Sequence, residues 1–248
     1  MVLKLILPLT LFTLILSACG QQSAAPPPTA DPLVADATAK EVGFKTEDQV
    51  DIKGTYYPPS NPQGQGPAIL LVHGLDGNKE SWQAFATAAQ KAGYAVLAFD
   101  IRGHGESGGG KFHDQMVQDL DAALNWMANR PEINGDRLGI VGATLGANLA
   151  LREGSLNPKV KSVVMLSPGL DYEGITTVDA LATYGQRAVM FVATENDTYA
   201  ADTARNLNSR ALGQHQLQIY PGSQQGIEVF QAQVGLTPMV LAWFSSTL

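Results

Sequence analysis

The chain has 248 residues, of which 45% are apolar and 16% are charged, as expected for a globular protein with a sizeable core. This length fits one large α/β domain, although two small domains are also compatible with it. The net charge of −7, from 16 basic and 23 acidic residues, favours solubility and gives no support for nucleic-acid binding.

The start of the chain carries the pattern of an export signal. Lys4 supplies a positive charge, and residues 5–16 form an apolar run, shorter than the roughly 20 residues that span a bilayer. The run ends in LSAC at 16–19, which closely resembles the lipobox of bacterial lipoproteins. The resemblance implies a signal peptide over residues 1–18 and a lipid on Cys19. We therefore expect an extracytoplasmic protein tethered to a bacterial membrane.

A plain secretory signal with a chance cysteine is the alternative interpretation. Cys19 is the single cysteine of the chain, so no internal disulfide can form. Residues 19–37 are expected to form an extended linker, because the stretch 21–32 lacks apolar periodicity and holds four prolines. The folded domain is then expected to span residues 38–248.

Strands and helices alternate along the rest of the chain. The stretches 41–46 and 50–57 predict a β-hairpin. Further strands are predicted from apolar runs at 68–72, 94–99, 137–141, 160–166, 188–193 and 217–220. Helices are predicted at about 81–92, 114–129, 145–152, 200–212 and 238–246. This order implies an α/β fold with a mostly parallel eight-stranded sheet flanked by helices. The polar stretch 167–186 leaves no room for a large lid.

Six segments that follow predicted strands carry short motifs in a fixed order. They are VHGLDGNKESW (72–82), FDIRGHGES (99–107), IVGATLGA (140–147), LSPGLDY (166–172), VATENDTYAADTARNL (192–207) and YPGSQQGIEVF (220–230). Together they resemble the α/β-hydrolase family from about residue 38 to the end. The nearest types are small esterases, dienelactone hydrolases and serine aminopeptidases. The resemblance implies an α/β-hydrolase fold with a minimal lid or none, and an ancestry in ester or amide hydrolysis.

The same resemblance assigns the positions of a catalytic site. Thr144 stands at the nucleophile position of a strand–turn–helix elbow, Asp197 at the acid position and Gln225 at the histidine position. The backbone N–H groups of Leu75 and Leu145 would be the oxyanion donors. Asp171 is an alternative acid. The elbow and loop glycines that the family geometry needs are Gly74, Gly142 and Gly146.

Two of these positions depart from the family pattern. Thr144 brings a β-methyl group to a position that normally needs a positive φ. Gln225 replaces the histidine of a Gly-x-Gly-His-Gly pattern, and an amide cannot accept a proton near neutral pH. Losing the serine or histidine of a triad costs about 10⁶ in turnover, and losing the other as well costs little more. The sequence therefore predicts that hydrolysis by the family mechanism is impaired.

Another histidine is a candidate replacement for the missing base. His104 lies in the loop after the fourth strand, whose tip can approach the site, and it is favoured over His113. His73 is expected to brace the oxyanion loop, and His215 to lie away from the catalytic end. No pair of acidic residues has metal-ligand spacing with a histidine, so neither a metal nor a cofactor is expected.

Three hypotheses remain open at this point. The first is an impaired hydrolase homologue whose pocket binds an ester-, amide- or carboxylate-like ligand, or which binds another envelope protein. The second is an active hydrolase that uses Thr144 as nucleophile, with His104 or a positioned water as base. The third is a structural envelope lipoprotein. The sequence does not indicate the ligand or the oligomeric state.

Overall fold

The computed structural model describes residue 2, residues 39–60 and residues 64–248. The chain divides into two units, residues 1–35 and residues 36–248, and the second unit is the one described below. The predicted signal peptide, Cys19 and the linker lie outside the described residues. Among the described residues, no helix has the length and apolar character needed to cross a membrane.

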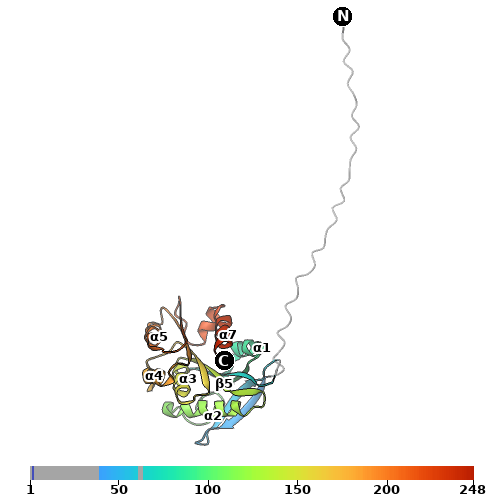
Figure 1. Cartoon of the computed structure of the whole chain (residues 1–248), viewed down its shortest axis with the longest axis vertical. Helices are drawn as coiled ribbons and strands as arrows, with labels where there is room; N and C mark the ends of the chain where they lie inside the picture. Colours follow the sequence, from blue (N-terminus) through green and yellow to red (C-terminus); the bar gives the residue numbers. More distant parts are fainter. Residues whose placement is uncertain (1, 3–38, 61–63) are drawn as a thin grey trace. The chain divides into compact units, whose positions relative to one another are not determined.

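One eight-stranded sheet organises this unit (Figure 1). The strand order is β1-β2-β4-β3-β5-β6-β9-β10, and β2 alone runs in the opposite direction to the other seven strands. The strands are β1 (Lys40–Lys45), β2 (Asp51–Tyr57), β3 (Gly66–Val72), β4 (Ala95–Phe99), β5 (Ile133–Ala143), β6 (Val160–Leu166), β9 (Ala188–Thr194) and β10 (His215–Tyr220). The predicted α/β fold and its mostly parallel sheet are confirmed.

Helices cover both faces of the sheet, and each face has its own apolar core. The core on one face includes side chains of α2 (Val117–Ala128), α3 (Leu145–Leu156), α4 (Val178–Tyr184) and α5 (Thr198–Arg210). The other core includes side chains of α1 (Gln83–Lys91), α6 (Glu228–Ala232) and α7 (Leu236–Thr247). Figure 1 shows α1 beside α7, in agreement with their contacts. Burial on two faces explains why the central strands are continuous apolar runs rather than alternating ones.

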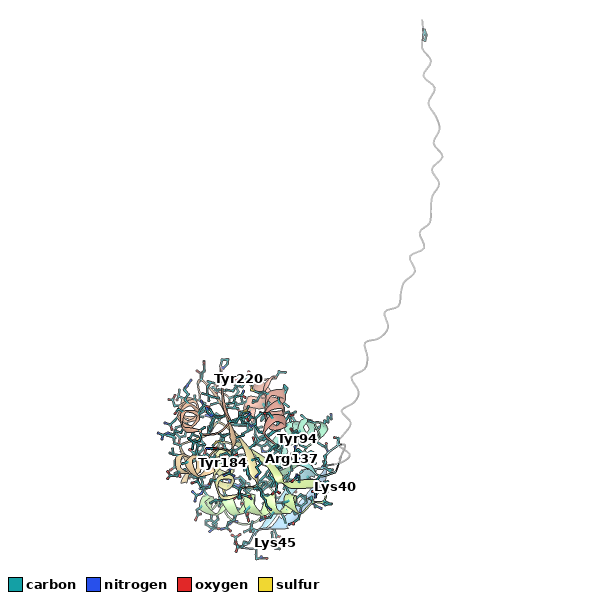
Figure 2. The ribbon with its side chains drawn as sticks, viewed as in Figure 1. Lys40, Lys45, Tyr94, Arg137, Tyr184 and Tyr220 are labelled. Carbon is teal, nitrogen blue, oxygen red and sulfur yellow. The ribbon has the colours of Figure 1, made fainter. Side chains whose placement is uncertain are left out.

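The edge strand β1 is protected by charge. Lys40 and Lys45 bound this strand (Figure 2), and Lys45 forms an ion pair with Asp51 of β2 at 3.0 Å. Charged side chains on an edge strand oppose pairing with another chain.

The segment predicted as a polar connection, residues 167–186, contains more structure than expected. Residues Asp171–Tyr172 (β7) and Ile175–Thr176 (β8) pair as a short hairpin, and α4 follows them. Leu181 and Tyr184 of α4 are buried, and α4 packs on α3 (Figure 2 labels Tyr184). Three buried residues in a seven-residue helix are too few to show a period in the sequence.

Two short turns complete the framework near the site. One is the 3₁₀ turn η1 (Lys79–Trp82), which leads into α1, and the other is η2 (His113–Gln115), which precedes α2. Buried ion pairs hold the adjoining loops. Arg102 pairs with Asp119 at 2.8 Å, and Lys79 lies 3.6 Å from Asp100. The first pair fixes the loop after β4 against α2, and the second fixes the same loop against the segment that follows β3.

Candidate functional site

A strained turn joins β5 to α3 at Thr144. The residue has φ 51° and ψ −115°, and its N–H donates to the carbonyl of Leu166 at 2.8 Å. A β-branched residue with positive φ is an outlier, and such a conformation costs about 1–3 kcal/mol. The positive φ of Thr144 is the geometry that the elbow pattern predicts. Threonine suits this geometry less well than serine does, because its side chain is β-branched.

Glycines allow the close approaches around this turn. A Cβ on Gly142 would overlap the backbone carbonyl of Gly146, and a Cβ on Gly146 would overlap the carbonyls of Val72 and His73. The end of β3 therefore passes directly against the start of α3. A Cβ on Gly74 would overlap Thr144 Oγ1, so the threonine hydroxyl lies against the loop after β3.

Two backbone donors lie beside the threonine. Within the described part of the chain, no hydrogen bond engages the N–H of Leu75, and none engages the N–H of Leu145, the first residue of α3. Leu75 and Thr144 line the same cleft. Free N–H groups at this place are what stabilisation of a developing oxyanion requires.

The cleft above the elbow has a volume of about 480 Å³. It brings Thr144, Leu75 and Gln225 together, while Asp197 is not among its lining residues. The cleft contains two carboxylates, Asp76 and Glu228, and among the described residues no lysine, arginine or histidine lines it. The lining residues are Gly74, Leu75, Asp76, Gly77, Ser81, Ala143, Thr144, Tyr172, Gln225, Gly226, Ile227, Glu228 and Gln231.

Asp197 stands at the acid position of the family pattern, and only one of its two carboxylate oxygens accepts a hydrogen bond within the described part of the chain. It caps α5 through a bond from the N–H of Ala200 to Oδ1 at 3.4 Å. Its Oδ2 is buried and has no partner among the described residues, and the residue is 7% exposed. A buried carboxylate oxygen without a donor destabilises the folded state, because it has lost its hydrogen bonds to water and has formed none with the protein.

Tyr172 lines the cleft and lies close enough to Asp197 for the carboxylate charge to affect its phenol. Its side chain lines the cleft, and burial, followed by the nearby charge of Asp197 and by Tyr199, raises the pKa of its phenol to about 12. A phenol with this pKa stays protonated near neutral pH and cannot serve as the missing base. Tyr172 therefore contributes a neutral hydroxyl and an aromatic face to the site.

Gln225 does not take over the role of an imidazole. Its side chain is exposed and makes no hydrogen bond to Thr144, to Asp197 or to any other described residue. The loop that carries it is held by its neighbours, since Gly226 N–H donates to Ser167 Oγ at 2.9 Å. An exposed amide at this position leaves Asp197 and Thr144 unconnected.

His73 holds the oxyanion loop, as the sequence predicts. Its Nε2 accepts a bond from the N–H of Ile101 at 3.0 Å, so Nδ1 carries the proton and donates to the carbonyl of Gly74 at 2.6 Å. Burial lowers the pKa of this imidazole to about 4, which keeps it neutral. The side chain thereby joins the loop after β3 to the loop after β4.

His104 is also bound to backbone groups rather than to Thr144. Its Nδ1 lies 3.0 Å from the carbonyl of Arg102, and its Nε2 lies 2.9 Å from the carbonyl of Leu75. A neutral imidazole can donate to only one of these carbonyls, and no hydrogen bond joins either nitrogen to Thr144. His113 faces Glu173 at 3.6 Å, and His215 is exposed at the start of β10.

Several cleft residues were not singled out by sequence reasoning. Asp76, Tyr172 and Glu228 line the cleft and lie within the family-like segments, without a role assigned to them there, and Gln231 directly follows the last of these segments. The alternative acid, Asp171, is exposed and its Oδ1 accepts from the N–H of Gly174 at 2.7 Å. Among residues 39–60 and 64–248, no cluster of three histidine, cysteine or acidic side chains is placed to hold a metal ion.

Comparisons with known proteins agree with this geometry. An uncharacterized protein of Mycobacterium tuberculosis is 30% identical over 146 residues, which cover 59% of this chain and 50% of that protein. A polyketide transferase of Stachybotrys chlorohalonatus is 29% identical over 140 residues, covering 54% of this chain and 46% of the transferase. The chain thus spans about half the length of the curated relatives it matches.

The fold is shared with solved enzymes. An esterase of Pyrococcus furiosus superposes with a TM-score of 0.72 at 21% identity, covering 84% of this chain and 91% of the esterase. The family profile described as "alpha/beta hydrolase fold" matches residues 67–225, from β3 to the position of Gln225. With the strained elbow, the glycine approaches and the sheet order, this match establishes that the chain belongs to the α/β-hydrolase-fold family.

Proposed function

We propose that this protein is a lipid-anchored α/β-hydrolase-fold protein that has lost its hydrolytic chemistry and retains a ligand-binding cleft. The observation that carries the proposal is the unpartnered Oδ2 of Asp197, buried at the acid position while Gln225 is exposed at the histidine position. A carboxylate at the family's acid position, with no histidine for it to orient, supports the loss of chemistry.

The remaining parts of the site support binding rather than turnover. Without a base, the Thr144 hydroxyl stays protonated and is a poor nucleophile. The donors at Leu75 and Leu145 need no base in order to bind an oxygen atom. An ester or amide carbonyl fits these donors. A free carboxylate fits less well, because Asp76 and Glu228 line the same cleft and repel it.

The named relatives point to the same ligand chemistry. One protein that this chain resembles is described as an esterase and another as a polyketide transferase, and we take an ester or a related acyl group as the ligand class of this cleft as part of the proposal. An active enzyme with Thr144 as nucleophile is the second candidate, favoured by the free oxyanion donors. It lacks a base, because both nitrogens of His104 face backbone carbonyls.

The first test compares hydrolysis of 4-nitrophenyl butyrate by the full-length chain in detergent with hydrolysis by Thr144→Ala. We expect both to match the rate of Thr183→Ala, an exposed threonine on α4 that controls for contaminating esterases. Because the site has no base to activate the Thr144 hydroxyl, removing this hydroxyl should not lower the rate of hydrolysis. Turnover that wild type and Thr183→Ala share and that disappears in Thr144→Ala would contradict the loss of chemistry and favour the second candidate.

The lipid anchor is tested separately by growing cells with a clickable fatty acid. Label is expected on the wild-type protein and not on Cys19→Ala, because this thiol is the single cysteine available for acylation. Equal labelling of both proteins, or no labelling of either, would remove the anchor from the proposal. Neither result bears on the chemistry at Thr144.

A further inference from the structure

The side chain of Thr144 has a defined orientation at the elbow. A Cβ on Gly74 would overlap Thr144 Oγ1, whereas a Cβ on Gly226 would lie 3.3 Å from the Thr144 methyl carbon. The hydroxyl therefore faces the loop after β3, and the methyl group faces the loop that carries Gln225. A β-branched side chain is restricted at χ1, so the two groups do not exchange places freely. The methyl group thus lies on the side where the family pattern has its histidine.

The protein does not use the Thr144 hydroxyl for a hydrogen bond of its own. Thr144 is the N-cap of α3, but its side chain makes no capping bond and has no other partner among the described residues. Capping needs a backbone in the β region, and Thr144 has φ 51° and ψ −115° instead. Unlike Asp197 Oδ2 and Trp82 Nε1, this unpaired oxygen is not fully buried, so a ligand in the cleft can reach it.

Three hydrogen-bond donors meet in this part of the cleft. The free N–H groups of Leu75 and Leu145 directly follow Gly74 and Thr144 along the chain. Because Thr144 Oγ1 lies against Gly74, the hydroxyl is close to both N–H groups. Donors grouped in this way stabilise a single oxygen atom, and they need no proton transfer in order to do so.

We infer that Thr144 is a specificity-determining residue of the cleft, whose hydroxyl donates to the carbonyl oxygen that also accepts from the N–H groups of Leu75 and Leu145. The inference rests on the proposed function, because it needs a carbonyl ligand in the cleft. A ligand with an acceptor oxygen satisfies these donors, and a ligand of the same shape without one leaves them unpaired. Thr144 is thus a binding residue in this protein, at the place where the family has a nucleophile.

The orientation of the side chain is tested first, by NMR of the full-length chain in detergent with carbon-13 in the threonine methyl groups. Thr144→Ser removes one methyl signal and thereby assigns it. We expect nuclear Overhauser effects from this methyl group to Gly226 and Ala143. A stronger effect to Gly74 would place the methyl group where the inference has the hydroxyl, and would overturn it.

The hydrogen bond is tested with two probes of matched shape. 4-Phenyl-2-butanone, labelled with carbon-13 at its carbonyl, carries the acceptor oxygen, and butylbenzene lacks it. Affinities for the full-length chain are measured by NMR titration, with protein-free micelles as the partition reference. We expect the bound ketone to show a downfield shift of its carbonyl carbon, because hydrogen bonds polarise the carbonyl group.

Two variants separate the hydroxyl from the methyl group. Thr144→Val keeps the β-branched shape and should weaken ketone binding about five- to tenfold, the effect of one neutral hydrogen bond, and change butylbenzene binding by less than about twofold. It should also reduce the downfield carbonyl shift. Thr144→Ser keeps the hydroxyl and should retain both. Thr183→Val, at an exposed position on α4, is the matched control, and urea unfolding checks that each variant is folded.

Equal ketone affinity and equal carbonyl shift in wild type and Thr144→Val would overturn the inference alone. Equal losses in Thr144→Val and Thr144→Ser would also overturn it, because serine retains the hydroxyl. A wild-type chain that does not bind the ketone would overturn the carbonyl ligand class of the proposed function together with the inference. The hydrolysis assay with Thr144→Ala tests the loss of chemistry independently of these results.

Discussion

Changing Thr144 to serine and Gln225 to histidine in the same chain is expected to raise 4-nitrophenyl butyrate hydrolysis about 10²- to 10³-fold above wild type. The serine removes the methyl group from the strained elbow, and the histidine supplies a base next to the unpartnered Oδ2 of Asp197. The backbone N–H groups of Leu75 and Leu145 are already free to donate to the oxyanion. Full turnover is not expected, because a small misplacement of the two introduced side chains can lower the rate about 10²-fold.

The single variants and one further change are the controls for this gain. Thr144→Ser and Gln225→His alone should remain near wild type, because the parts of a triad act as a unit. Adding Asp197→Asn to the active double variant should remove most of the gain, since the imidazole then loses its orienting carboxylate. A double variant no faster than either single variant would show that the scaffold, and not only the chemistry, has diverged.

Replacing Glu153 by glutamine is expected to stabilise the protein increasingly as the pH rises. Glu153 lies on α3 and is 3% exposed, and its Oε1 accepts one bond from Asn157 Nδ2 at 3.3 Å. Burial, with a smaller contribution from Asp121, raises the pKa of this carboxyl from 4.5 to about 8. The folded state therefore keeps a proton that the unfolded state releases, and stability falls as the pH rises from 4.5 to about 8.

Glutamine has nearly the same shape and no proton to lose, so it removes this dependence. Between pH 6 and pH 9 the stability advantage of Glu153→Gln over wild type should grow by about 2–3 kcal/mol. Urea unfolding at the two pH values measures it. Asp202→Asn, an exposed position paired with Arg205, is the matched control and should show no such growth. An advantage independent of pH would mean that Glu153 is ionised in the folded state.

The fold could be predicted from the sequence because its central strands are buried on both faces. The run at 68–72 is 0% exposed throughout, and such runs stand out in any composition. Strand boundaries were predicted less well where polar residues join the sheet only through backbone pairing with a neighbouring strand. β5 begins at Ile133 rather than at residue 137, and its polar first half joins the sheet through the pairing of Ile133 with Gly66. That partner lies far away in the sequence.

The sequence predicted which residues stand at the elbow, but it did not predict which buried polar atoms lack a hydrogen-bond partner. Close-packed glycines leave a sequence signature, so Thr144 and Gly146 could be placed at the elbow. The unpaired Oδ2 of Asp197 and the unpaired indole of Trp82 leave none. Whether a buried polar atom finds a partner depends on which segments meet in space, and a single sequence does not give those distances.

The loop that carries Gln225 also bears on how such a protein can arise. Gly226 is held by its bond to Ser167 and by a φ of 51°, and a Cβ there would press on Ala143 and on the methyl group of Thr144. The side chain at 225 takes part in none of these contacts. Selection for a folded protein therefore constrains the glycine and leaves its neighbour free to vary. If turnover is not needed, a histidine at position 225 can be replaced at no cost to folding, while the glycine at 226 is retained.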